Sequence, residues 1–95
     1  MYAVVSIWSR DKARTEEQMQ TLQERIVPNV RQSRGFVAGY WTNDHATGKD
    51  HVMIVLDTEE NARAFKANVE QQRDTQLASG VTMELMTVTE VLASA

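Results

Sequence analysis

Two segments of this chain alternate as β-strands do, yet both alternating sets of side chains are apolar. The sets are Tyr2, Val4 and Trp8 against Ala3, Val5 and Ile7 in the first segment, and Val52, Ile54 and Leu56 against Met53 and Val55 in the second. Successive side chains of a strand point to opposite faces of its sheet. A sheet built from such strands needs a cover on both faces, which is the strongest constraint on the fold.

The first helical pattern follows the N-terminal strand. Its apolar side chains share one face and are Met19, Leu22, Ile26 and Val30. The helix should begin near Thr15, which forms a capping-box pattern with Gln18. Pro28 removes a backbone donor and should kink the last turns before Gly35, which suits the position after a helix cap.

A hairpin pattern comes next: GFVAGYW (residues 35–41), the polar stretch Thr42 to Asp50, and HVMIVL (51–56). Ala38 and Gly39 are small at the centre of a strand, which predicts space under the helices on one side and close approach of a sheet on the other. The neighbours Tyr40 and Trp41 must point to opposite faces. The long loop leaves open which of them faces the helices.

A second helix should start at Asp57, which pairs with Glu60 in an N-cap pattern. Glu59 and Arg63 lie one helical turn apart and can form an ion pair. Gly80 should end this helix, and VTMELMTVTEVL (residues 81–92) alternates again as a long final strand.

The resulting order, strand, helix, strand, strand, helix, strand, predicts an α+β fold of the ferredoxin-like βαββαβ type with a four-stranded antiparallel sheet. The 95 residues suffice for a single domain, 1–95. Two helices can cover only one face of the sheet, whereas both faces are apolar. The simplest cover for the second face is the same face of another copy, so we expect a homodimer.

Composition limits the function. Without cysteine there is no disulfide framework or thiolate metal site, and the net charge of −3 comes from interspersed charges that do not form a nucleic-acid-binding face. The absence of cysteine suits a reducing compartment, so we expect a cytoplasmic protein. The apolar run at the N-terminus is too short for a membrane span and follows no basic segment, so we expect no membrane partner. The four glycines are not grouped into a phosphate-binding loop, and we expect no cofactor.

The candidate binding residues are Trp8, Tyr40, Trp41 and His51. The three aromatic residues suit a pocket for a flat organic ligand, but equally suit a core or a dimer interface. His45 and His51 are the two possible proton shuttles, although a loop position and a strand end suit ordinary solvated or pairing roles. Their spacing lacks the usual ligand geometry, so we expect no metal.

The strand order, the junction RGFVAGYW (34–41) and the run HVMIVLDTEENARAF (51–65) resemble the dimeric α+β barrel superfamily, and within it the antibiotic biosynthesis monooxygenase (ABM) type. The resemblance implies a pair of sheets facing each other in a barrel. Its haem-degrading branch uses an Asn, a Trp and a His. Here Ser6 and Leu56 stand at the first two positions and residues 58–79 contain no His, so haem degradation is not expected. Leu56 also departs from the quinone-forming branch.

The resemblance favours an ABM-like small-molecule protein, either a cofactor-independent monooxygenase or a binder of aromatic, polyketide-like compounds. An oxygenase of this kind needs a general base and a donor to a phenolate. His51 is the only obvious base in the sequence, and no catalytic residue is assigned. The alternative is a non-catalytic homodimeric scaffold or accessory protein, favoured by the absence of a recognised catalytic or cofactor motif.

Overall fold

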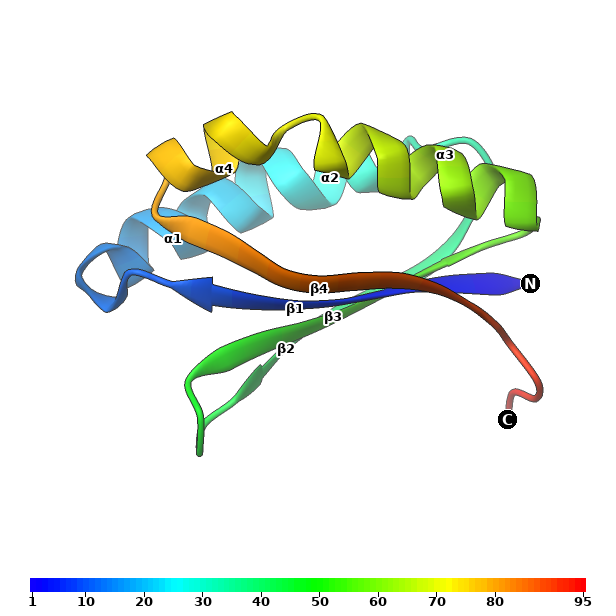
Figure 1. Cartoon of the computed structure of the whole chain (residues 1–95), viewed down its shortest axis with the longest axis horizontal. Helices are drawn as coiled ribbons and strands as arrows, with labels where there is room; N and C mark the ends of the chain where they lie inside the picture. The colour runs from blue at the N-terminus through cyan, green and yellow to red at the C-terminus, as the bar shows by residue number, and fades with distance from the viewer.

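The computed structural model describes residues 1–95 and has one layer of helices on one face of a four-stranded sheet (Figure 1). The strands are β1 (Tyr2–Arg10), β2 (Phe36–Asp44), β3 (Lys49–Leu56) and β4 (Val81–Glu90). They are all antiparallel and lie in the order β2-β3-β1-β4. The predicted α+β fold with a ferredoxin-like order of elements is thereby confirmed.

The first helical region is divided into a short turn η1 (Lys12–Arg14), α1 (Thr15–Thr21), a π-helical stretch η2 (Leu22–Ile26) and α2 (Val27–Arg31). Pro28 lies in the first turn of α2, and the π-helical stretch directly before it accommodates the missing donor. The predicted change of helix character before Gly35 is confirmed.

The predicted capping box at the start of this region is wrong. Asp11 caps the turn instead, since its side chain accepts a hydrogen bond from the backbone N–H of Ala13 at 3.0 Å. Thr15 donates its hydroxyl to the carbonyl of Lys12, and Gln18 turns toward the end of the second helical region. Gln18 makes a long-range contact that a local pattern cannot foresee.

The second helical region consists of α3 (Glu59–Glu70) and α4 (Arg73–Ala78) rather than one continuous helix. Its N-cap is Thr58, one residue later than expected, and the Thr58 hydroxyl accepts from the N–H of Asn61 at 3.1 Å. The Asp57 carboxylate accepts from the side-chain amide of Asn61 at 2.7 Å. The expected pair of Arg63 with Glu59 is present at 3.2 Å.

The hairpin strands extend further into the polar stretch than the sequence indicated, leaving residues 45–48 as the turn. The N–H of Gly48 donates to the carbonyl of Asp44 at 2.7 Å, and Gly48 has a φ of 75°. The last strand ends at Glu90, two residues earlier than the predicted run to Leu92.

The strand register decides which side chains face the helices. Trp41 pairs with Val52, which is buried, whereas Tyr40 pairs with Met53, which is 45% exposed. Trp41 therefore faces the helices, and Tyr40 faces the other side, which we call the open face. The core lies on the helix side and contains Val4, Val52, Ile54, Leu56 and Ala62.

The open face has no cover within the chain. Tyr40, Met53 and Leu85 are each about half exposed or more on it. In Figure 1 the hairpin turn and the C-terminal tail both extend to this side of the sheet, away from the helices. The apolar pattern of the strands on both faces is confirmed, while the partner that was predicted to cover the open face remains a prediction. No helix in the structure has the length and apolar character to cross a membrane.

Candidate functional site

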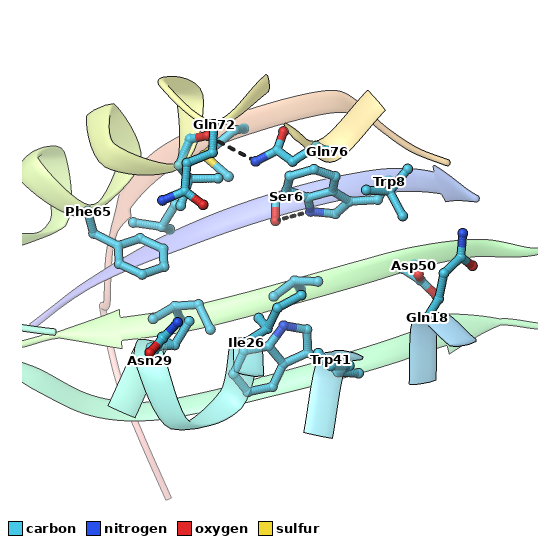
Figure 2. A pocket seen from close by; sticks show the side chains of 18 of the residues that line it. Ser6, Trp8, Gln18, Ile26, Asn29, Trp41, Asp50, Phe65, Gln72 and Gln76 are labelled. Atoms are coloured by element: carbon cyan, nitrogen blue, oxygen red, sulfur yellow. Dashed lines mark hydrogen bonds between the residues drawn. The ribbon is translucent and has the colours of Figure 1, made fainter. Parts of the chain in front are cut away.

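A cavity of about 410 Å³ lies between the helix layer and the sheet (Figure 2). Its floor comes from all four strands, and its walls come from both helical regions. Apolar side chains form most of the lining, among them Val4, Ile26, Ile54, Phe65 and Met86. A cavity of this size with a few polar groups among apolar walls is typical of a small-molecule site.

Both tryptophans of the chain line this cavity, but their indole N–H groups are used differently. Trp8 donates to the hydroxyl of Ser6 at 2.8 Å, on the same strand (Figure 2). The indole N–H of Trp41 makes no hydrogen bond within the chain, and it is not fully buried. Trp41 thus presents the one accessible, unpaired indole donor in the cavity.

Gly39 explains how the small centre of β2 serves this site. A Cβ placed on Gly39 would lie 3.0 Å from the Ile54 side chain and 3.3 Å from the Trp41 ring. The space that a larger residue would take is therefore filled by these two side chains. Gly39 therefore leaves room for the Trp41 ring on the helix side of β2.

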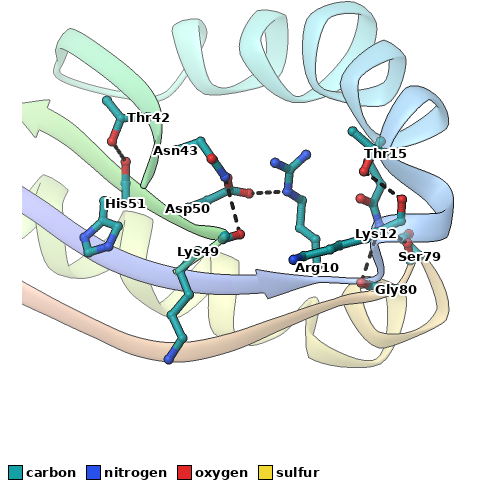
Figure 3. A network of polar contacts seen from close by, with 12 residues as sticks. Arg10, Lys12, Thr15, Thr42, Asn43, Lys49, Asp50, His51, Ser79 and Gly80 are labelled. Atoms are coloured by element: carbon teal, nitrogen blue, oxygen red, sulfur yellow. Dashed lines mark hydrogen bonds and ion pairs between the residues drawn. The ribbon is translucent and has the colours of Figure 1, made fainter. Parts of the chain in front are cut away.

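One end of the cavity is polar and belongs to the network in Figure 3. Nε of Arg10 lies 2.8 Å from Oδ2 of Asp50, and the side-chain amide of Asn43 donates to Oδ1 of Asp50 at 2.9 Å. The side chains of Arg10 and Asp50 are only 18% and 22% exposed. They are the only two charged residues in the cavity lining.

Three glutamines from the helix layer line the cavity, and two of them, Gln18 and Gln76, bond to backbone carbonyls. The Gln18 amide donates to the carbonyls of Ser79 and Gly80, and the Gln76 amide donates to the carbonyl of Val69. Their carbonyl oxygens are buried without a hydrogen-bond partner. An unpaired buried acceptor costs about 1–3 kcal/mol relative to a paired one.

The structure brings together only part of the predicted set of binding residues. Trp8 and Trp41 share the cavity, but Tyr40 and His51 lie on the open face, where Tyr40 is 63% exposed and His51 pairs with Ile7 of β1. His51 therefore cannot serve as a base in the cavity. His45 lies in the exposed hairpin turn.

Sequence reasoning missed Arg10 and Asp50 as members of the site. They are 40 positions apart, and Asp50 was expected in the polar stretch before a strand that begins at His51. The signal that places Asp50 is the register, which pairs it with Trp8 on one side and Asn43 on the other.

The pKa values of Tyr2, Asp44 and Glu84, which lie outside the cavity, are shifted. A hydrogen bond from the Tyr2 hydroxyl to Glu90 raises the Tyr2 pKa. The backbone amide of Ala46 lowers the pKa of Asp44, and the hydrogen bond from Lys49 lowers the pKa of Glu84. No three histidine or carboxylate side chains converge in a way that could hold a metal ion.

Comparison with known proteins identifies the fold. No protein-family model matches the chain, and no curated protein matches it. A solved structure described as a "putative antibiotic biosynthesis monooxygenase" from Deinococcus radiodurans matches with a TM-score of 0.78 and 19% sequence identity, over 100% of this chain and 96% of that chain. At this identity the likeness concerns the fold. The chain thus has an antibiotic biosynthesis monooxygenase-like (ABM-like) fold.

Proposed function

We propose that the protein binds a flat aromatic small molecule in the cavity between its helices and its sheet. The observation that carries this proposal is the cavity of about 410 Å³ into which both tryptophans of the chain project. Aromatic walls favour a planar ligand, because stacked or edge-to-face ring pairs add to the burial of apolar area. A polyketide-like ring system of two or three fused rings is the class that fits.

The activity that fits this site best is cofactor-independent oxygenation, in line with the name of the structural neighbour. In such a reaction an anthrone-like substrate first loses a proton, and its carbanion then reduces dioxygen. The C–H₂ carbon becomes a carbonyl, so that anthrone and O₂ give anthraquinone and water. The protein has to accept the proton, donate to the developing oxyanion and exclude water.

Residues of the cavity can take two of these roles. Asp50 is the only carboxylate in the lining and is our candidate proton acceptor, replacing His51. Trp41 offers an unpaired N–H for the oxyanion. Trp8 cannot do so without giving up its bond to Ser6.

Two measurements on metal-free protein test the proposal. Isothermal titration calorimetry with anthraquinone derivatives should show saturable binding, and the fluorescence of both tryptophans should change, since both line the cavity. An oxygen electrode with anthrone should show uptake above buffer that Asp50→Asn abolishes. Binding without uptake would reduce the proposal to a carrier or binder. If the protein shows no binding and no oxygen uptake, the result favours the scaffold alternative.

We further propose that a second copy of the chain covers the open face. This face carries Tyr40, Met53 and Leu85 in an exposed position, and the tail beyond β4 presents Leu92, which is 89% exposed. A stable dimer typically buries about 800 Å² per partner, an area that one face of a four-stranded sheet can supply. Sedimentation equilibrium at micromolar concentration should give twice the chain mass of 10.8 kDa.

A further inference from the structure

We propose that the polar end of the cavity is a carboxylate subsite built on Arg10, and that the natural ligand is a flat aromatic carboxylic acid. This inference rests on the proposed function, because it uses the same cavity. It adds the chemical class of the ligand's polar group and the residue that recognises it.

The guanidinium of Arg10 has unused donors where a ligand could reach them. In its ion pair with Asp50, Nε lies 2.8 Å from Oδ2, and neither terminal nitrogen makes a hydrogen bond within the chain. Neither terminal nitrogen is fully buried, so a ligand can reach them. In Figure 3 the guanidinium is directed from β1 toward the side of the first helical region. Two parallel N–H groups match the two oxygens of a carboxylate.

Asp50 and Asn43 fix the orientation of Arg10. Asp50 is held on one side by the Asn43 amide at 2.9 Å and on the other by Nε of Arg10 at 2.8 Å. These two contacts restrain the position of the guanidinium, and its terminal N–H groups have no hydrogen-bond partner within the chain. Pre-organisation of this kind lowers the entropy cost of binding.

The charges around this end favour an anion despite the presence of Asp50. A carboxylate on the outer edge of the guanidinium would lie closer to the cation than to the Asp50 oxygen on its Nε side, so attraction exceeds repulsion. Lys12 adds a second positive charge beside the hairpin turn, where a Cβ on Gly48 would lie 3.4 Å from the Lys12 ammonium. Lys12 itself makes no ion pair with any carboxylate of the chain.

The apolar part of the cavity then receives the ring system of the acid. Trp8 is the cross-strand neighbour of Asp50, so an aromatic ring next to the carboxylate would meet the Trp8 indole. Phe65 and Ile26 continue the apolar lining beyond it. The subsite therefore orients the ligand with its charged end at Arg10 and its rings between the helices and the sheet.

The first test compares two ligands of equal shape on the unmodified protein. We expect anthraquinone-2-carboxylate to bind about 10- to 100-fold more tightly than anthraquinone-2-carboxamide, as calorimetry measures it, because a charge-assisted bidentate pair replaces a neutral contact. Equal affinities would overturn the carboxylate subsite while leaving the aromatic-binding proposal in place. Binding of neither compound would overturn both.

Variants then assign the effect to Arg10. Arg10→Gln should abolish the preference for the carboxylate with little change for the carboxamide, and Arg25→Gln, at an exposed residue outside the cavity, should leave the preference intact. Asp50→Asn keeps Arg10 and removes a negative charge, so the carboxylate should bind several-fold more tightly. The double variant Arg10→Gln, Asp50→Asn leaves no unpaired charge, and it should also lack the preference. A preference that survives in both Arg10 variants would refute the assignment.

Discussion

The indole N–H of Trp8 donates to the hydroxyl of Ser6 at 2.8 Å, two residues earlier on the same face of β1. Ser6 is the only buried polar residue of the chain, with 2% of its surface exposed. A polar side chain at this position in the core is tolerated because it satisfies the indole, and the indole in turn keeps its ring in the cavity wall.

Ser6→Ala should therefore destabilise the fold by about 1–3 kcal/mol, since it leaves the Trp8 donor unpaired in an apolar wall. Urea denaturation monitored by far-UV circular dichroism measures the change. Trp8→Phe removes the donor that Ser6→Ala leaves unpaired. Trp8→Phe should therefore lower the free energy of unfolding less in the Ser6→Ala background than in the unmodified protein. Strictly additive losses would show that the hydrogen bond contributes nothing.

The order of elements and the two apolar faces of the sheet could be predicted because both depend on local periodicity. The register could not be predicted. β1 and β4 shift against each other between Ile7 and Trp8, and β2 and β3 shift between Phe36 and Ala38, and each shift changes which residues lie opposite. The length of the loop between the two hairpin strands likewise left the directions of Tyr40 and Trp41 open.

The candidate site depended on contacts of this long-range kind. The two tryptophans were predicted as ligand candidates from their chemistry alone, but Arg10 and Asp50 meet only through the pairing of β1 with β3. The N-cap of α3 could not be predicted from residue type either. Asp57 and Thr58 are both good N-cap residues, and the backbone rather than the residue type selects Thr58.

Gly35→Ala should be far more damaging than Gly48→Ala, although both glycines have a positive φ, of 80° and 75°. A Cβ on Gly35 would overlap the Asp57 carboxylate and the Asn61 amide, which bond each other at the start of α3. A Cβ on Gly48 meets only the flexible Lys12 side chain. We expect a loss of about 1–2 kcal/mol for Gly48→Ala, from backbone strain alone, and a clearly larger one for Gly35→Ala. Equal melting temperatures for the two variants would contradict this account.

The stability of the fold should depend on the ion pair of Glu84 with Lys49 in a pH-dependent way. The hydrogen bond from Lys49, 2.7 Å long, lowers the pKa of Glu84 below its ordinary value of 4.5. A depressed pKa in the folded state means that the stabilisation is present above pH 4.5 and is lost as the pH falls through the lower, folded-state pKa. Because the pair is exposed, the effect is small.

Melting temperatures measured from pH 6 to pH 3 test the sign of this effect. The difference between the unmodified protein and Glu84→Gln should shrink toward the acid end. Lys49→Gln should remove the same pH dependence from the other side of the pair. A difference that stays constant or grows in acid would show that the pair does not titrate as described.

Met53→Asp tests the proposed second copy on the open face. Met53 lies at the centre of this face, between Tyr40 of β2 and Val5 of β1, and is 45% exposed. In a single chain the aspartate would remain in water, whereas in a dimer it would be buried without a partner. We expect sedimentation to show the mass of one chain, or a loss of folding. Gln23→Glu, which adds the same charge to the exposed helix side, should leave the assembly unchanged.

Trp41→Phe tests whether the unpaired indole donor contacts the ligand. The change keeps an aromatic ring on the helix side of β2 but removes the N–H group, which has no partner in the chain. Anthraquinone-2-carboxamide should bind about 2- to 10-fold more weakly, the size of one neutral hydrogen bond. The smaller ring also enlarges the cavity, so naphthalene, which has no acceptor, serves as the comparison and should lose much less. Tyr40→Phe removes a hydroxyl from the opposite face and should leave both affinities unchanged. If Trp41→Phe weakens the binding of naphthalene and of the carboxamide equally, Trp41 contributes only through its volume, and the proposal that it donates a hydrogen bond to the ligand is wrong.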